Sequence, residues 1–588
     1  MITSAVQASK GACPFDILIR NIRIVNVFTD SAEPGCIGIS GNRIAYAGPE
    51  EPDMKALHSI DGNGQWALPG FVDAHMHLES SMLTPDHFAR IALSHGTTTV
   101  AADPHEITNV MGPDGVQALT DACRDLPLRV LVMAPSTVPS SPGFEDSGCS
   151  IGAAEAGKLL DLPGVWGLGE VMDFNAVAEG DPHILSVIEE AHKRNCLIDG
   201  HASVLTGRRL QTFRAAGIDS DHTLGTAEKL HEELALGFCV QIQEAMLNKE
   251  LVKAMNEAPV QNRICLVTDD VPLPRLMKNG HLNHVVARAI ELGLDPIRAV
   301  RFATINPAER LRLYHTGAIA PGMTADIQLV KNLEHPEAEL VLCSGKIVWE
   351  NGRFIPELPA YHPPKSMLSS LHIRPLREED FEISCCVPPS FHGGTGLINL
   401  IGQDGVSFRT RHIQKTVRLS PEKNGRARAE TAPLLKMAVC NRYGKQQRGL
   451  ALLDGMDNVI GAAALTYGHD SHNLTIFGGN DADMAAAANA LIRTQGGLCT
   501  ARNGNIETLV PLPLAGLLSP EAPEVLLKQL EAFLDSCRNL GFSHQNLLSF
   551  FTIMPLAVSP EIKCTDRGLL DVVHKRFLPL VEQIKEDI

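Results

Sequence analysis

The spacing of hydrophobic and polar residues changes at Gly70. Between residues 15 and 65, "DILIRNIRIVNV" alternates strand-forming residues with polar ones, and "GCIGISGNRIAYAG" has the pattern of two strands around a Gly-Asn turn. Beyond Gly70, short apolar runs alternate with segments of helical period, such as 85–96, 183–195 and 227–237. The pattern therefore predicts an all-β segment followed by parallel α/β construction.

Eight apolar runs in the α/β part have the length of β-strands. They span residues 71–75, 96–102, 129–135, 165–170, 196–201, 218–222, 238–243 and 264–270. Eight strands alternating with helices over about 240 residues predict a TIM-like (β/α)8 barrel. A doubly wound open sheet is the alternative, but no glycine-rich phosphate-binding sequence follows the first run.

Imidazole and carboxylate side chains stand at the carboxyl ends of several runs. These residues are His75, His77, Glu170, His201, His222 and Asp269. In such barrels the carboxyl ends of the strands meet at the face that carries the active site. Nitrogen and oxygen ligands suit zinc, manganese or ferrous iron. A strand-end aspartate often only caps a helix, and a single histidine often only satisfies a polar neighbour, but six residues at strand ends together predict a metal site.

Composition and charge narrow the class of protein. The 588 residues are 44% hydrophobic and 20% charged, which predicts a globular protein of several domains. A formal net charge of −17 argues against a nucleic-acid partner, which needs a basic surface. No apolar run has the length of a membrane span, and the N-terminal residues lack the apolar core of a signal peptide. With 14 cysteines and no CxxC pair, we expect free thiols and a cytoplasmic location.

Two stretches resemble the amidohydrolase superfamily of metal-dependent hydrolases. "PGFVDAHMH" (69–77) is similar to its first-strand signature, and "TGAIAPGMTADIQLV" (316–330) resembles the returning half of its small β-sandwich. The resemblance implies one discontinuous β-sandwich domain from residues 1–68 and 310–365, on either side of a barrel at 69–309. Many members carry a carbamylated lysine at the end of the fourth strand. Glu170 stands there in this chain and can bridge metals without carbamylation.

More specific motifs resemble the prokaryotic adenine deaminase family. In the family's order they are "DAHMHLESSMLTP", "GTTTVAADPHEITNVMG", "GLGEVMDF", "DGHA", "DSDHT" and "TDD". "GHDSHNLTIFGGNDADMAAAANALIRTQGGL" is similar to the extra domain of that family, which implies an additional C-terminal α+β domain at residues 370–588. The resemblance spans nearly the whole chain.

The resemblance also implies a mechanism. His75, His77 and Asp269 would hold one divalent metal, and His201 and His222 would hold a second, with Glu170 bridging; manganese, ferrous iron and zinc all fit. A metal-activated hydroxide would attack C6 of adenine and release hypoxanthine and ammonia, a reaction of purine salvage or catabolism. Asp269 would carry a proton from the water to the departing ammonia. The expected catalytic residues are Asp269, together with Glu170 and His222 among the metal ligands.

Six further residues are expected to bind the substrate. They are Glu79, Ser80, His105, Glu106, His469 and His472. For the two glutamates the alternative is a solvated loop carboxylate or a charge at a helix start. For the two histidines of "GHDSHN" one hypothesis is a loop over the barrel mouth that supplies histidine to a metal or to the purine and helps exclude water. Their replacement by alanine would then leave thermal stability near that of the wild type. The alternative is a strand-to-turn connection in which they satisfy only local backbone groups.

The sequence favours adenine deamination over three other functions. Another amidohydrolase reaction, on a cyclic amide or an N-acyl substrate, would share the barrel and the metals, but "DPHEI" and the C-terminal part favour adenine. A non-catalytic assembly protein would be expected to lack metal ligands, and all six are present. The unrelated zinc deaminases need a PCxxC sequence, which is absent. The expected partners are therefore adenine and further copies of this chain, in a homodimer or larger assembly, with no membrane partner.

Overall fold

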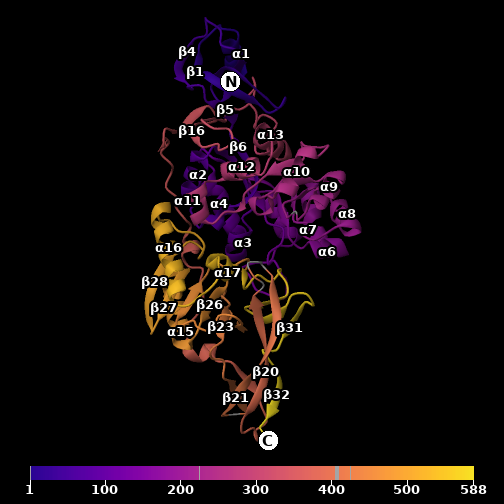
Figure 1. The fold of residues 1–588 in the computed structure, drawn as a ribbon, viewed down its shortest axis with the longest axis vertical. Coiled ribbons are helices and arrows are strands. Elements are labelled where there is room, and N and C mark those ends of the chain that lie inside the picture. Colours follow the sequence, from indigo (N-terminus) through magenta and orange to yellow (C-terminus); the bar gives the residue numbers. More distant parts are fainter. Residues whose placement is uncertain (1, 224, 404, 406–408, 424, 588) are drawn as a thin grey trace. The chain divides into compact units, whose positions relative to one another are not determined.

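The computed structural model describes residues 2–223, 225–403, 405, 409–423 and 425–587, and they form two compact units (Figure 1). Unit 1 contains Met1–Pro104, Val116–Ser136 and Gly152–His362. Unit 2 contains His105–Gly115, Thr137–Ile151 and Pro363–Ile588. Two short segments from the first half of the chain thus fold with its C-terminal part. No helix among the described residues is both long and apolar enough to cross a membrane.

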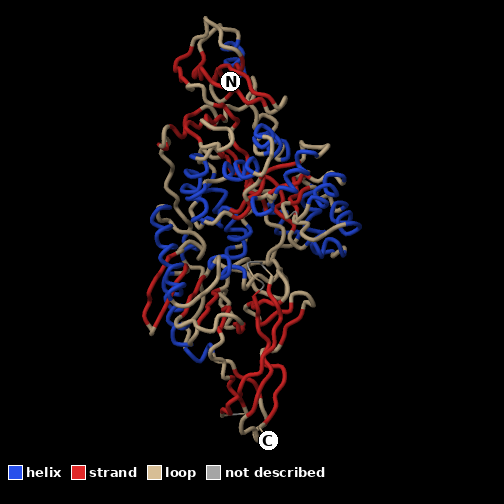
Figure 2. Tube along the Cα trace, viewed as in Figure 1, coloured by secondary structure: helices blue, strands red, loops and turns tan. Residues whose placement is uncertain are grey.

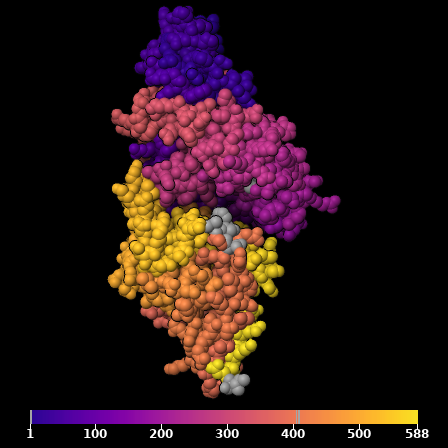
Figure 3. All heavy atoms as spheres, in the orientation of Figure 1, coloured from indigo at the N-terminus to yellow at the C-terminus, as the bar shows by residue number. Residues whose placement is uncertain are grey.

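The outer sheet of unit 1 takes strands from both sides of the α/β part. Its strands are β1 (Phe15–Asn26), β2 (Ser31–Ser40), β3 (Arg43–Gly48), β4 (Ala56–Asp61), β5 (Trp66–Pro69), β15 (Ile327–Val330), β16 (Ala338–Cys343), β17 (Lys346–Glu350) and β18 (Arg353–Phe354). β5 and β15 pair antiparallel, with Ile327 opposite Pro69. In the space-filling view the indigo N-terminal strands accordingly lie beside the salmon segment that carries β15–β18 (Figure 3). Helix α1 (Ile2–Ser9) buries Ala8 against Phe15 and Leu18 of this sheet.

The centre of unit 1 is parallel. One ladder has the order β10 (Leu197–Gly200), β9 (Val165–Val171), β8 (Arg129–Ala134), β7 (Thr97–Ala102), β6 (Phe71–His77) and β14 (Asp269–Asp270). A second ladder contains β11 (Ser220–Asp221), β12 (Cys239–Ile242) and β13 (Ile264–Leu266). Each apolar run predicted from the sequence overlaps at least one of these strands, and all of their pairings are parallel. The prediction of parallel α/β construction is therefore confirmed.

Helices follow the strands and cover them (Figure 2). They are α2 (Pro85–Ser94), α4 (Pro113–Cys123), α5 (Ala153–Leu160), α6 (Phe174–Glu179), α7 (Pro182–Lys193), α8 (Gly207–Ala215), α9 (Ala227–Ala235), α10 (Lys249–Glu257), α11 (Leu273–Asn279), α12 (Leu282–Glu291), α13 (Pro296–Phe302) and α14 (Ile305–Arg310). Helix α7 shows why they form. The Asp181 side chain caps its first turn, and Ile184, Val187, Ile188 and Ala191 bury one stripe of helical period.

Side chains from strands of both ladders meet in one apolar core. It contains Val72, Ala74, Ala101, Leu131, Met133, Leu197, Cys239, Cys265 and Val267, with Ala308 and Leu311 from the region of α14. Asp73, fully buried in β6, accepts hydrogen bonds from the backbone nitrogen and the hydroxyl of Thr268. These bonds hold the run 264–270 against β6 and place Asp269 next to the first strand.

Unit 2 is built on a largely antiparallel sheet. Its strand order is β19 (Ser384–Cys386), β22 (Arg426–Ala429), β21 (Thr410–Glu422), β20 (Gly394–Gln403), β24 (Arg448–Leu453), β23 (Leu435–Cys440), β26 (Leu474–Gly478), β25 (Ala462–Leu465), β27 (Gly497–Arg502) and β28 (Asn505–Pro511), with β32 (Val581–Glu586) beside β20. Helix α15 (Asp481–Thr494) packs Met484 and Leu491 into the core of the sheet. The other elements are α16 (Pro523–Asn539), α17 (Leu547–Ile553), β29 (Ile562–Thr565), β30 (Gly568–Asp571) and β31 (Arg576–Leu578).

Buried polar contacts hold the two early segments inside unit 2. The carbonyl of Asn109, in helix α3 (His105–Met111), accepts hydrogen bonds from the nitrogen of Gly148 and the hydroxyl of Tyr443. The carboxylate of Asp146 receives the Lys445 ammonium at 2.8 Å and the Arg567 guanidinium at 2.6 Å. His105 and Glu106 consequently belong to the same compact unit as His469 and His472.

Candidate metal and catalytic site

The structure brings the six predicted metal ligands together in unit 1, at the carboxyl ends of the parallel strands. Three overlapping groups each place their ligand atoms within 4.8 Å of one another: His75, His77 and Glu170; His75, His222 and Asp269; and Glu170, His201 and His222. His75 and His77 lie at the end of β6 and Glu170 lies near the end of β9. Because period-two alternation puts residues 75 and 77 on one face of β6, both reach the same cluster.

The carboxylate of Glu170 lies between two sets of ligands. Its Oε1 lies 3.4 Å from His77 Nε2, whereas its Oε2 lies 2.6 Å from His201 Nδ1 and 3.3 Å from His222 Nε2. Asp269 Oδ1 lies 3.2 Å from His77 Nε2 and 3.6 Å from His75 Nε2. The cluster thus has one side built from His75, His77 and Asp269 and another built from His201 and His222, with Glu170 facing both.

Hydrogen bonds on the far side of three rings determine which nitrogen faces the cluster. His75 Nδ1 lies 2.7 Å from Asp199 Oδ2, His77 Nδ1 lies 2.9 Å from the carbonyl of Asp103, and His222 Nδ1 lies 3.1 Å from the carbonyl of Gly200. Each partner is an acceptor, so in the neutral ring that a metal requires each Nδ1 carries the proton and each Nε2 presents a lone pair. His75 Nε2 has no hydrogen-bond partner among the described residues. These donors fit a divalent metal ion.

Without a metal, the charges of the cluster compensate one another. Burial opposes ionisation of Glu170, but His222 and His201 outweigh it and hold the pKa of this carboxyl well below its usual range. Burial likewise opposes ionisation of Asp269, but the neighbouring imidazoles of His75 and His77 hold the pKa of this carboxyl well below normal. Burial also disfavours the charged form of His75, but the carboxylates of Asp199 and Asp269 raise its pKa well above 6.5. Protons therefore occupy the place that a metal cation would take.

Three residues that support the cluster were not singled out from the sequence. Asp199 accepts the Nδ1 proton of His75, and Asp103 Oδ2 accepts a hydrogen bond from the Glu170 nitrogen at 2.7 Å. Gln243 Nε2 donates to Asp269 Oδ2 at 2.6 Å. Asp199 lies in the motif "DGHA" and Asp103 in the motif "GTTTVAADPHEITNVMG", and Gln243 ends the seventh predicted strand. Their positions were visible in the sequence, but their partners were not.

Local backbone geometry brings two of these carboxylates into place. Gly169, which precedes Glu170, has no side chain, and a Cβ there would lie 2.1 Å from Asp103 Oδ2. Only glycine allows Asp103 to approach so closely. Asp269 has a φ of +57°, a left-handed conformation that costs about 1 kcal/mol or more. Such strain is typical of residues whose orientation matters for function.

Glu79 and Ser80 lie in the 3-10 turn Leu78–Ser81 that follows β6, and both are buried. The Ser80 hydroxyl donates a hydrogen bond to Asp270, the neighbour of Asp269. The alternative that Glu79 is a solvated carboxylate is wrong, because its side chain has no exposed surface. Both residues therefore flank the ligand cluster from within unit 1.

A second histidine–carboxylate cluster lies inside unit 2. The two oxygens of Glu106 contact His469 Nδ1 and His472 Nε2, and His105 Nε2 lies 3.6 Å from Oε1. Glu106 is 1% exposed, so the solvated-carboxylate alternative is wrong here too. The nitrogen of Gly468 donates to His472 Nδ1 at 3.2 Å, which leaves the proton of the neutral ring on Nε2 as a donor to Glu106. The two histidines thus do more than satisfy local backbone groups.

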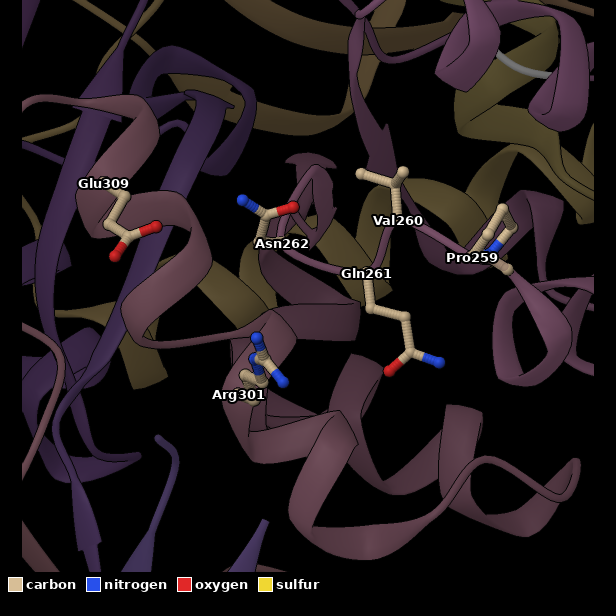
Figure 4. A pocket seen from close by; sticks show the side chains of 7 residues that line it. Pro259, Val260, Gln261, Asn262, Arg301 and Glu309 are labelled. Carbon is tan, nitrogen blue, oxygen red and sulfur yellow. The ribbon is translucent and has the colours of Figure 1, made fainter. Parts of the chain in front are cut away.

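Unit 1 has a surface pocket whose lining includes no member of the ligand cluster. Figure 4 shows the side chains that line it. Its lining residues are Ala258, Pro259, Val260, Gln261, Asn262, Arg301 and Glu309. Residues 258–262 precede β13, so the pocket opens at the amino-terminal end of that strand. The candidate metal ligands stand at the opposite, carboxyl ends of the parallel strands. This pocket is therefore not where a substrate would meet the ligands.

Comparison with known proteins gives two family matches and a set of relatives. Residues 66–348 match the amidohydrolase family, and residues 407–576 match the adenine deaminase C-terminal domain. The adenine deaminase of Moorella thermoacetica is 38% identical over 586 residues, covering 98% of this chain and 97% of that protein. The adenine deaminase of Nitratidesulfovibrio vulgaris is 36% identical, with 97% of each chain covered. That of Staphylothermus marinus is 35% identical, with 98% and 97% covered.

Proposed function

Because this chain belongs to the adenine deaminase family, we propose that the ligand cluster of unit 1 is the site at which it deaminates adenine. The enzyme converts adenine and water to hypoxanthine and ammonia. The observation that supports this site most is the convergence of four imidazole nitrogens and two carboxylates at the carboxyl ends of parallel strands. In barrel enzymes catalytic groups gather there.

The donor set fits two divalent metal ions. His75, His77 and Asp269 would hold one ion, His201 and His222 would hold the other, and Glu170 would face both. Nitrogen and oxygen ligands of this kind suit manganese, ferrous iron or zinc. When bound, such ions lower the pKa of a water so that hydroxide is available near neutral pH.

The proposal assigns the proton transfer of the reaction to Asp269. Its Oδ1 faces His75 and His77, while its Oδ2 points to Gln243. In the deamination, a water oxygen forms a bond to C6 and the bond between C6 and the exocyclic nitrogen breaks. Asp269 takes a proton from the water and delivers it to the departing nitrogen, which leaves as ammonia. Glu170 and His222 would contribute as ligands that hold the metal ions beside the attacking water.

Six residues are proposed to bind the purine. They are Glu79, Ser80, His105, Glu106, His469 and His472. Glu79 and Ser80 directly follow the ligands of β6. The buried carboxylate of Glu106 and the histidines around it are polar groups of the kind that can hydrogen-bond the edge of a purine. This chemistry supports a role for them in substrate binding.

Architecture, assembly and location are also part of the proposal. The pairing of β14 with β6 supports a closed (β/α)8 barrel within residues 69–309. The shared outer sheet supports a β-sandwich from residues 1–68 and 310–365, and the antiparallel sheet with its helices supports an α+β domain at 370–588. The free thiols of all 14 cysteines support a cytoplasmic location. We propose a homodimer or larger assembly.

Ammonia release tests the function directly. The purified protein, loaded separately with manganese, ferrous iron and zinc, is incubated with adenine, adenosine, cytosine and hydantoin. We expect ammonia from adenine and little from adenosine, because a site for the free base excludes the ribose. Failure to release ammonia from adenine with every metal would contradict the proposal. Hydrolysis of hydantoin instead would favour the alternative of a cyclic-amide hydrolase.

A further inference from the structure

Gln243 is the residue at the end of the seventh strand and lies directly after β12. Its Nε2 donates to Asp269 Oδ2 at 2.6 Å and to the carbonyl of His222 at 3.3 Å. Both partners are acceptors, so the amide nitrogen must face them and the amide oxygen must face away. The orientation of this side chain therefore follows from its hydrogen bonds.

The amide oxygen of Gln243 has an unused hydrogen-bonding capacity. Among the described residues no donor bonds to Oε1, and the residue is only half-buried. One side chain thus binds the catalytic carboxylate through its nitrogen and presents an acceptor beside it through its oxygen. Adenine carries a matching group, because its exocyclic nitrogen has two N–H donors.

We propose that Gln243 positions both Asp269 and the leaving nitrogen, an inference that rests on the proposed function. Its amide nitrogen holds Asp269 Oδ2, and its amide oxygen accepts an N–H of the exocyclic amino group of adenine. Once the water oxygen has bonded to C6, the amino nitrogen has a localised lone pair. Because Gln243 holds one N–H of this nitrogen, the lone pair faces the proton carried by Asp269. The proton passes to the nitrogen, the bond to C6 breaks with its electron pair on nitrogen, and ammonia departs.

The test compares two glutamines of unit 1 in the metal-loaded enzyme. Gln243→Met keeps the length of the side chain but removes its donor and acceptor. Gln261→Met is the matched control. Gln261 is also half-buried and donates to a carbonyl, that of Asn256 at 3.1 Å, but it lies at the amino-terminal end of β13 (Figure 4). For each protein we would measure kcat and KM for adenine, bound metal, and competitive inhibition by purine, which lacks the amino group.

We expect Gln243→Met to lower kcat about 100-fold, the range for losing one group that orients charge in a transition state. Bound metal and the inhibition constant of purine should stay within about twofold, because neither depends on an amino group or a proton transfer. Gln261→Met should keep the wild-type kcat. Gln243→Glu, which has the same size but cannot donate to an ionised Asp269, should lose as much as Gln243→Met.

Wild-type kcat in Gln243→Met would overturn the inference. Loss of metal in both Gln243 variants, or a rise in the purine inhibition constant as large as the fall in kcat, would also overturn it, since either result means a purely structural role. These outcomes are distinct from failure of the proposed function, in which the wild type and Gln261→Met themselves release no ammonia from adenine.

Discussion

The two units of this chain each contain a buried histidine–carboxylate cluster, and the two clusters use their imidazoles in opposite ways. In unit 1 the Nδ1 atoms of His75 and His77 face oxygen acceptors, so their Nε2 lone pairs point into the cluster. In unit 2 the Nδ1 atom of His472 faces the N–H of Gly468, so its Nε2 carries a proton and donates to Glu106.

The difference shows that the hydrogen-bond partner of Nδ1 determines whether Nε2 of the same neutral ring offers a lone pair or a proton. An oxygen acceptor at Nδ1 leaves the Nε2 lone pair of a neutral ring available to a metal ion, whereas an N–H at Nδ1 leaves a proton on Nε2 for a hydrogen bond. The cluster of unit 1 therefore gathers lone pairs that a cation can satisfy. The cluster of unit 2 satisfies the Glu106 carboxylate with the protons of its own histidines.

The largest expected effect is loss of the unit 1 ligands. Glu170→Gln or His75→Ala should reduce adenine turnover by roughly 10⁴-fold or more and lower the bound metal, because the charge and the lone pair that hold it are gone. Glu106→Gln should retain the full metal content, because Glu106 belongs to the other cluster. Ammonia release and elemental analysis of the purified proteins measure both quantities. Full metal content in Glu170→Gln would contradict the assignment of Glu170.

A smaller effect is expected from removing the Asp199 carboxylate, which accepts the Nδ1 proton of His75. Asp199→Ala removes the acceptor of the Nδ1 proton, so we expect metal affinity to fall by roughly 10- to 100-fold. Asp199→Asn keeps an oxygen that can accept this proton and should lose less. Competition with a chelator of known affinity gives the values. Equal affinities in Asp199→Ala and the wild type would show that the ring orientation does not depend on this bond.

Removing a donor from the unit 2 cluster should affect stability as well as turnover. The sequence predicts a loop histidine whose removal leaves stability unchanged. Because His472 is fully buried, we instead expect His472→Ala to lower the free energy of unfolding of unit 2 by about 1–3 kcal/mol, as Glu106 loses a donor. Turnover should fall roughly tenfold with the metal retained, if Glu106 acts on the purine.

Calorimetry and metal analysis of His472→Ala and His469→Ala measure these effects. The His469 side chain is partly exposed, at 16%, so His469→Ala should destabilise unit 2 less than His472→Ala. If a variant that combines His469→Ala and His472→Ala kept the stability and turnover of the wild type, neither histidine would have a role in either property.

The smallest effect is a difference in pH dependence between the units of the metal-free protein. The pKa of His75 and of His77 is raised above 6.5, so their contribution to stability is complete below pH 6.5 and is lost as pH rises through the folded-state pKa. Burial lowers the pKa of His472, so its contribution is complete above pH 6.5 and is lost as pH falls through the folded-state pKa.

Calorimetry of the chelated protein between about pH 5 and pH 8 tests this difference, since histidines titrate in that range. Compared with the matching His→Ala variants, the contribution of His75 and His77 to unit 1 should be lost toward high pH and that of His472 to unit 2 toward low pH. Added metal should reverse the trend in unit 1, because metal ions compete with protons for the same nitrogens. Parallel shifts of both transitions in the chelated protein would contradict the tautomers assigned to the two clusters.

Local patterns predicted much of the central fold and all six members of the ligand cluster. The predicted strands overlap β6 to β14, and the segments of helical period correspond to α2, α7 and α9. The six candidate ligands were visible because each lies at or within two residues of the end of a strand-like run, and parallel strands bring their carboxyl ends together. Asp199 and Gln243 were not recognised, because a support residue is identified by the partner it touches and not by its place in a run.

The sequence by itself determined the order of strands and helices and the residue types at the strand ends, since both follow from local periodicity. Only the tertiary structure decided that residues 105–115 and 137–151 fold with the C-terminal part and that Glu106 pairs with His472, 366 residues away. It also decided which nitrogen of each histidine faces its cluster. Contacts between segments far apart depend on how strands pack, and such packing leaves no periodic trace along the chain.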